Sequence, residues 1–209
     1  MRAFFWMFIL GFAFCTCDTI RSNRAEQRTG IDESYAGTQR EIWQQPEMII
    51  DRFGDLSNKT AVDLGTGYGY FALFLANHAE QVLALDINQE FVTRLDSIAQ
   101  VDSLNIDARL VKRNDPLLAP AEADAVMMGN TYMFIEDRIN YLNTLKKGMK
   151  KGGKLIIVDF KKKQTRLGPP TEGRVPLYEV EQELNAAGFM VTESNDTALD
   201  YQYIIVAVK

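Results

Sequence analysis

The chain has 209 residues, of which 46% are hydrophobic and 24% are charged. This composition is typical of one globular domain and excludes collagen, coiled-coil and fully disordered chains. The 23 basic and 28 acidic side chains give a formal net charge of -5, which argues against a general nucleic-acid binder held by phosphate contacts. One histidine, His78, and two cysteines, Cys15 and Cys17, are too few for a zinc site built from these residue types. We therefore expect neither a nucleic-acid partner nor a metal.

The N-terminal segment has the pattern of an export signal. Arg2 precedes an apolar run over residues 3–14, which is shorter than the roughly 20 apolar residues needed to cross a bilayer. The segment resembles a bacterial lipoprotein signal, and this resemblance implies that Cys17 becomes the lipidated first residue. We therefore expect a protein of the bacterial cell envelope that is tethered to the membrane through this segment.

Domain boundaries follow from this interpretation. They place a leader at residues 1–17, a polar tether at residues 18–37 and the folded domain at residues 38–209. Cleaved soluble export and an uncleaved anchor remain alternatives. Positive charges that follow the apolar run favour an anchor with the domain in the cytoplasm: Arg21, Arg24 and Arg28.

From residue 42 onward, short apolar runs alternate with longer amphipathic segments, a pattern typical of a parallel sheet covered by helices. The predicted strands are residues 61–64, 82–86, 108–112, 125–128, 155–159, 190–192 and 203–208. The predicted helices are residues 42–53, 70–77, 90–99, 137–149 and 176–187. The last two strands lie close together in the sequence, which predicts a C-terminal hairpin beside the parallel strands.

The fourth predicted helix has its own face and end signals. Its apolar residues recur three or four positions apart and would face the sheet: Ile139, Leu142, Leu145 and Met149. Lysines near its end suit the negative end of the helix dipole, and Gly152-Gly153 would then end the helix.

The sharpest local signal is the stretch Val62-Asp63-Leu64-Gly65-Thr66-Gly67-Tyr68-Gly69-Tyr70, in which a strand runs into three alternating glycines and then a helix. Glycines allow a tight turn and a close approach of the backbone to a ligand, while the following helix offers free amides. Asp86 ends the next apolar strand, where a carboxylate can accept two ribose hydroxyls. A dinucleotide site would need the third glycine one residue later, so a nicotinamide oxidoreductase is the weaker interpretation.

This arrangement resembles the class I S-adenosylmethionine-dependent methyltransferases, in particular the small enzymes similar to those of ubiquinone and menaquinone biosynthesis. The resemblance covers roughly residues 41–208. It implies a three-layer Rossmann-like α/β fold, with a mostly parallel seven-stranded sheet and an antiparallel C-terminal strand. It also implies S-adenosylmethionine as the cofactor, bound by these residues: Asp63, Gly65, Thr66, Gly67, Gly69, Asp86, Ile87, Asn114, Asp115 and Asn130.

The acceptor side is less specific. In similar sequences the loop after the fourth strand often carries paired histidines, but here Met133 and Phe134 follow Tyr132. Tyr132 would line the acceptor pocket or pack in the core. Asp159, at the end of the fifth strand, would act as a general base or cap the strand end. These two residues are the candidate catalytic groups.

Two further segments could border the acceptor. Residues 40–46 could cover the cofactor as a lid, with Tyr35 and Trp43 as aromatic walls, or form a covering helix with a buried tryptophan. Arg174 lies in a segment that resembles the loop after the fifth strand of similar methyltransferases, where it could clamp an anion. Nine basic residues between positions 146 and 166 could attract acidic substrates or simply face solvent.

The sequence therefore predicts a methyltransferase that transfers a methyl group from S-adenosylmethionine to a small or lipidic acceptor. The cofactor itself carries the reactive methyl group, so alignment of the two reactants is the main task of the protein. The alternative is a noncatalytic binding protein of the cell envelope that keeps the same fold.

Overall fold

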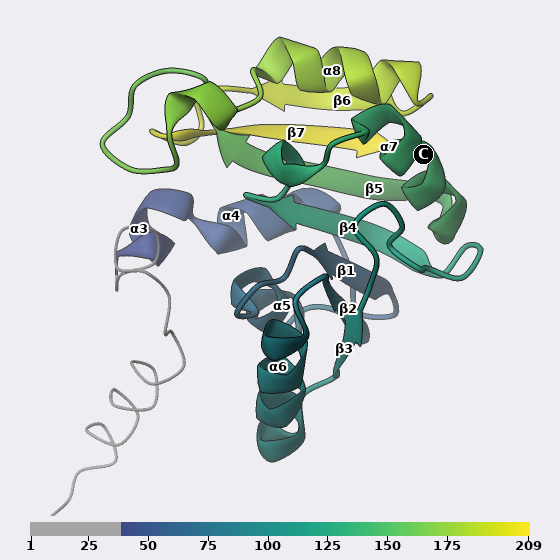
Figure 1. The fold of residues 1–209 in the computed structure, drawn as a ribbon. Coiled ribbons are helices and arrows are strands. Elements are labelled where there is room, and N and C mark those ends of the chain that lie inside the picture. Colours follow the sequence, from purple (N-terminus) through teal and green to yellow (C-terminus); the bar gives the residue numbers. More distant parts are fainter. Residues whose placement is uncertain (1–38) are drawn as a thin grey trace, which may run out of the picture. The chain divides into compact units, whose positions relative to one another are not determined.

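A computed structural model describes residues 39–209. The predicted leader and tether, including Cys17 and Tyr35, lie outside these residues. The described part contains a seven-stranded sheet in the order β3-β2-β1-β4-β5-β7-β6, in which only β7 runs antiparallel to its neighbours (Figure 1). The strands are β1 (Thr60–Leu64), β2 (Gln81–Asp86), β3 (Ile106–Leu110), β4 (Ala123–Gly129), β5 (Met149–Phe160), β6 (Met190–Asn195) and β7 (Gln202–Val208). The predicted sheet and its terminal hairpin are confirmed, although β3 lies two residues earlier than predicted.

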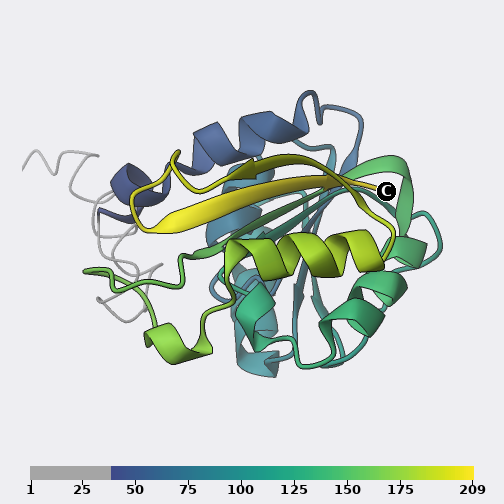
Figure 2. The ribbon, with the colours of Figure 1, turned by 90° about the horizontal axis from the view of Figure 1, so that it is seen from above.

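Helices cover both faces of this sheet. They are α3 (Arg40–Gln44), α4 (Pro46–Ile50), α5 (Tyr70–Leu75), α6 (Gln89–Asp102), α7 (Arg138–Gly148) and α8 (Leu177–Ala186). Short 3-10 turns add η1 (Asp51–Phe53), η2 (Tyr132–Phe134) and η3 (Thr171–Gly173). Figure 2 shows α4 on one side of the sheet and α7 and α8 on the other, so the fold has three layers.

Each face of the sheet buries its own hydrophobic core. Val62 and Leu64 of β1 pack in the core beneath α7 and α8, while their neighbour Ala61 packs in the core beneath α4, α5 and α6. Successive side chains of a strand point to opposite faces, so a strand buried on both faces needs an unbroken apolar run. This explains why the central strands read as continuous apolar segments in the sequence.

The predicted helix over residues 42–53 is in fact two short helices and a 3-10 turn. Gln45 separates α3 from α4 with φ 49° and ψ 61°, in the left-handed region. The reason is Pro46, which disfavours the right-handed helical conformation at the preceding residue and then suits the first turn of the next helix. The break leaves α3 as a separate five-residue element at the carboxyl edge of the sheet.

The helix predicted over residues 137–149 ends within one residue of the observed end, but the role predicted for Gly152-Gly153 in ending it is wrong. Helix α7 ends at Gly148, and β5 already begins at Met149, where it pairs with Ala123 of β4. Backbone hydrogen bonds that join Gly152 and Gly153 to Lys209 hold this end of β5 in the sheet. Ile139, predicted to face the sheet, is 40% exposed, whereas Leu142 and Leu145 are buried as expected.

Several basic residues of the segment 146–166 bond to other groups of the protein. Lys146, Lys154 and Lys161 donate hydrogen bonds to backbone carbonyls, and Lys150 pairs with Asp124 at 2.7 Å. Several of these lysines therefore fix local structure. Over residues 39–209, no helix combines the length and apolar character needed to cross a membrane.

Candidate functional site

The glycine loop connects β1 to α5 in a backbone conformation that favours glycine. Gly65, Gly67 and Gly69 have φ values of +74°, +53° and +87°, and Gly69 is the N-cap of α5. Residues with a Cβ rarely adopt this region, which explains the three alternating glycines. A Cβ at Gly65 would lie 2.4 Å from the side chain of Thr131, whereas a Cβ at Gly67 would meet open space. The loop therefore packs on one side and leaves free space on the other.

Asp63 holds this loop from below. Its carboxylate is 2% exposed and accepts hydrogen bonds from Thr66 Oγ1 at 2.7 Å and from the Ala72 amide at 2.9 Å. The second bond satisfies an amide in the first turn of α5, which has no partner within the helix. Burial raises the pKa of Asp63 to about 6.

Asp86 ends β2 beside the same loop. Its Oδ2 accepts a hydrogen bond from the Gly67 amide at 2.8 Å, and its Oδ1 accepts one from the Asn88 amide at 2.9 Å. The first of these bonds ties the loop after β1 to the end of β2. The predicted cofactor carboxylate is therefore in contact with the predicted glycine loop.

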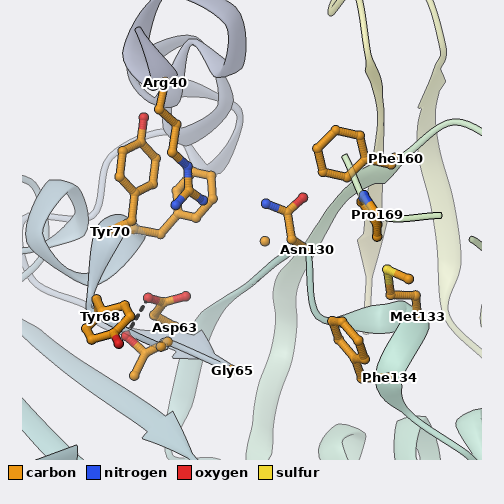
Figure 3. Close-up of a pocket in the computed structure, with 14 residues that line it drawn as sticks. Arg40, Asp63, Gly65, Tyr68, Tyr70, Asn130, Met133, Phe134, Phe160 and Pro169 are labelled. Atoms are coloured by element: carbon orange, nitrogen blue, oxygen red, sulfur yellow. Dashed lines mark hydrogen bonds between the residues drawn. The ribbon is translucent and has the colours of Figure 1, made fainter. Parts of the chain in front are cut away.

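A cavity of about 310 Å³ opens at the carboxyl ends of the strands (Figure 3). Its lining residues are Arg40, Asp63, Gly65, Thr66, Gly67, Tyr68, Tyr70, Phe71, Gly129, Asn130, Met133, Phe134, Phe160 and Pro169. Figure 3 shows Arg40, Tyr70 and Asp63 along one wall. The opposite wall is apolar and consists of Phe160, Pro169, Met133 and Phe134. Asn130 lies between the two walls.

Arg40 and Tyr70 give the polar wall its charge and its flat surface. The guanidinium carbon of Arg40 lies 3.7 Å from the centroid of the Tyr70 ring, a cation–π arrangement. Burial lowers the pKa of Arg40 to about 10, while Asp63 and Tyr70 favour its charged form. Within residues 39–209, the buried hydroxyl of Tyr70 has no hydrogen-bond partner. This wall can therefore attract an anionic group.

Five of the ten residues predicted to bind the cofactor line the cavity directly: Asp63, Gly65, Thr66, Gly67 and Asn130. Gly69 belongs to the same loop without lining the cavity. The remaining four lie outside the lining: Asp86, Ile87, Asn114 and Asp115. Ile87 is 49% exposed, and Asp115 accepts a hydrogen bond from the Leu117 amide at 2.8 Å.

The two candidate catalytic residues lie outside the lining of the cavity. Tyr132 is completely buried, and its hydroxyl donates a hydrogen bond to Glu183 at 2.7 Å. Asp159 is 1% exposed and accepts hydrogen bonds from the amides of Met133 and Phe160, while burial raises its pKa to about 6. In this geometry, Tyr132 packs in the core and Asp159 caps the end of β5.

The predicted acceptor contacts also differ. Arg174 is 3% exposed and donates hydrogen bonds to the carbonyls of Lys161, Lys163 and Pro169, so its guanidinium holds the loop after β5 and does not face the cavity. Trp43 is half-buried and lies outside the lining, with its ring centroid 5.9 Å from that of Phe160. Trp43 thus packs near Phe160, which is one of the lining residues.

Sequence patterns did not single out several lining residues. Arg40 belongs to the segment predicted as a possible lid, and Phe160 was not among the predicted site residues. Tyr70 could have been predicted to line the site, because it is the first residue of α5 and directly follows the glycine loop. No group of three or more His, Cys, Asp or Glu residues in the described part of the chain could hold a metal ion.

Comparison with known proteins shows what this chain is similar to. Residues 62–157, which are 96 of the 209 residues, match the model of the methyltransferase domain family. This segment is therefore similar to a methyltransferase domain. No curated protein matches the sequence. The matched region contains the glycine loop and Asp86, so the similarity includes the segment between β1 and the end of β2.

Solved structures agree with the methyltransferase fold. A SAM-dependent methyltransferase from Aquifex aeolicus has a TM-score of 0.77 and 25% identity, with 83% of this chain and 94% of that chain covered. An S-adenosylmethionine-dependent methyltransferase from Mesorhizobium loti has a TM-score of 0.66 and 13% identity, with 78% and 96% covered. An N-methyltransferase from Haemonchus contortus, in complex with phosphomonomethylethanolamine and S-adenosylhomocysteine, has a TM-score of 0.65 and 16% identity, with 80% and 52% covered. Together with the domain match, these similarities support a class I methyltransferase and S-adenosylmethionine as its cofactor.

Proposed function

We propose that the protein binds S-adenosylmethionine at the glycine loop and transfers its methyl group to a small or lipidic acceptor. The observation that carries this proposal is the position of the cavity. It lies between the three-glycine loop of a methyltransferase domain and an apolar wall built from the loops after β4 and β5. Ligands of open parallel sheets bind at this edge, beyond the carboxyl ends of the strands.

The residues present fit this cofactor. Gly67 faces open space, so a ligand can approach the loop backbone closely. The polar wall offers the cation of Arg40 and the carboxylate of Asp63, which together suit a zwitterionic amino acid group. Asp86 would hold the ribose, and Asp115, beyond β3, would lie toward the adenine. When bound, S-adenosylmethionine supplies a methyl group made electrophilic by a positively charged sulfur.

The apolar wall would receive the acceptor. Met133, Phe160 and Pro169 offer hydrocarbon and aromatic surface, and Phe134 is 64% exposed at its edge. These side chains would exclude water from the reacting atoms and hold the acceptor against the donor, so that the reaction gains mainly from proximity. An acceptor with an apolar body fits this wall better than a strongly charged one.

We also propose a membrane tether, on the sequence of residues 1–37 alone. Lipidation at Cys17 would place the domain at the bacterial cell envelope, where lipidic acceptors are concentrated. The alternative is an uncleaved anchor with the domain in the cytoplasm. Mass spectrometry of the native N-terminus decides between them, because lipid on Cys17 supports the first and an intact leader supports the second.

The proposed cofactor is tested by calorimetric titration of S-adenosylmethionine and S-adenosylhomocysteine into the full chain in detergent. We expect micromolar binding that weakens at least about tenfold in Asp86→Ala, because this change removes the proposed ribose contact and a hydrogen bond to the loop. Asp55→Ala is the matched control. Asp55 accepts a hydrogen bond from the Ser57 amide, two residues later, just as Asp86 accepts one from the Asn88 amide. Absence of binding to the folded wild type would overturn the proposal.

A further inference from the structure

A chain of four polar side chains runs from the covering helix to the centre of the cavity. Arg40 Nε donates a hydrogen bond to Gln44 Oε1 at 2.6 Å, and Gln44 Nε2 donates one to Gln202 Oε1 at 3.0 Å. Gln202 Nε2 in turn donates a hydrogen bond to Asn130 Oδ1. The chain joins α3, the first residue of β7 and the residue after β4, three segments far apart in the sequence.

The two glutamines are unusual in their burial. Gln44 and Gln202 have no exposed surface at all, although a buried amide costs free energy unless its polar atoms are bonded. Here each amide uses its oxygen as an acceptor and its nitrogen as a donor within the chain. A satisfied buried network of this kind favours one arrangement of its members.

The donor-to-acceptor order of these hydrogen bonds follows from Arg40. A guanidinium can only donate, so Gln44 must accept through its oxygen and donate through its nitrogen. The same order then passes to Gln202, whose nitrogen meets the oxygen of Asn130. The amide of Asn130 thereby keeps its nitrogen, Nδ2, for the cavity.

Asn130 is well placed to use this nitrogen. Its backbone has φ 60°, in the left-handed region, so its side chain does not continue the alternating pattern of β4. Figure 3 shows the amide nitrogen of Asn130 directed toward the wall that carries Arg40. The cavity therefore presents a cation and an amide donor to the same space.

We propose that Gln44 and Gln202 are positioning residues that fix Arg40 and Asn130 as a carboxylate-binding subsite. The ligand group is the carboxylate of an amino acid zwitterion, whose ammonium would lie toward Asp63. This inference rests on the proposed function, because it assigns the amino acid end of S-adenosylmethionine to this subsite. Gln44 and Gln202 themselves are absent from the cavity lining, so they act through their neighbours.

The test compares two ligands that share the adenosine part. S-adenosylhomocysteine carries the amino acid end, whereas 5′-methylthioadenosine lacks it. Both are titrated by calorimetry into the full chain in detergent. The variant Gln202→Glu can still accept from Gln44 but its carboxylate cannot donate to Asn130, which leaves the amide of Asn130 free to turn its oxygen to the cavity.

We expect Gln202→Glu to weaken S-adenosylhomocysteine at least tenfold and to leave 5′-methylthioadenosine within twofold of the wild type. Gln202→Met removes the hydrogen bonds of residue 202 to Gln44 and Asn130 without adding charge, and it should show the same selectivity. Gln44→Met breaks it at the other glutamine and serves if a Gln202 variant fails to fold. The control is Gln100→Glu, at an exposed glutamine on α6.

The two ligands separate the possible failures. If the wild type binds neither compound, the proposed function fails. If the wild type binds both and the folded variants weaken both equally, or neither, the positioning role is overturned while the proposed cofactor stands. A loss confined to the ligand with the amino acid end supports the subsite, because a general loss of structure would weaken both compounds.

Discussion

At the scale of single residues, Gly65 is the most constrained position of the loop. Its φ of +74° disfavours any other residue, and a Cβ would lie 2.4 Å from Thr131. We expect Gly65→Ala to lower the free energy of unfolding by about 2–4 kcal/mol, from backbone strain together with this steric overlap. Chemical denaturation measures the loss, and calorimetry with S-adenosylhomocysteine should show weakened binding.

Gly152, on β5, provides the matched control for this substitution. It has a similar φ, +78°, but a Cβ there would meet no atom within 4 Å. Gly152→Ala should therefore cost only the backbone strain, about 1–2 kcal/mol, and leave ligand binding unchanged, since Gly152 is exposed and outside the cavity lining. Equal losses in the two variants would show that contact with Thr131 is unimportant.

Residue by residue, the sequence predicted the part of the site that lies within one continuous segment. Asp63 and the glycine loop were identified because strand, loop and helix follow one another directly. The sequence left Tyr132 between the acceptor pocket and the core, and it placed Arg174 at the acceptor site, because the partners of these residues cannot be found by local spacing. The partner of Tyr132 is Glu183, 51 residues away, and those of Arg174 include backbone carbonyls that carry no sequence signal.

At the scale of elements, Arg174 organises the loop that joins β5 to α8. Its guanidinium donates hydrogen bonds to the carbonyls of Lys161, Lys163 and Pro169 and to Thr165 Oγ1. One side chain therefore links several points of this loop. Removal would leave several carbonyls without a donor, at about 1 kcal/mol for each lost bond. We expect Arg174→Ala to destabilise the fold by about 2–4 kcal/mol.

The same variant should also show faster hydrogen exchange across residues 161–173, measured by mass spectrometry. Arg113→Ala, at an exposed arginine, is the control and should leave that segment unchanged. Uniform exchange changes over the whole domain would instead indicate that Arg174 stabilises the fold without a special role in this loop.

Element boundaries were harder to predict than element types. The start of β5 shows why, since residues 146–153 have the basic residues and glycines typical of a helix end, whereas β5 already begins at Met149. Pairing of Met149 with β4 and of Gly153 with Lys209 decides the outcome, and both are contacts between distant segments. Such contacts override local preference.

At the scale of the whole molecule, the alternation of strands and helices predicted a parallel sheet covered by helices, and the resemblance implied three layers and an antiparallel last strand. The order of the strands in the sheet was not predicted, because periodicity alone does not say which strands are neighbours. The cavity was not predictable as a shape, since Arg40, Asn130 and Phe160 come from separate parts of the chain and meet only in the folded sheet.

The stability of the whole domain should depend on pH through its buried carboxyls. Burial raises the pKa of both Asp63 and Asp159 from 3.8 to about 6. A carboxyl with a raised pKa binds its proton more tightly in the folded protein, so its contribution to stability is fully present below about pH 4. That contribution is lost as the pH rises through about 6.

Asp159 is the better of the two for a test, because it lies outside the cavity lining. In Asp159→Asn the ionisable group is gone, so the free energy of unfolding of the variant minus that of the wild type should rise between pH 4 and pH 7. The raised pKa corresponds to a rise of about 3 kcal/mol, measured by urea denaturation across this range. Asp51→Asn, at an exposed carboxylate, is the control. A pH-independent difference for Asp159→Asn would mean that the hydrogen bonds from Met133 and Phe160 fully offset the effect of burial on this carboxyl.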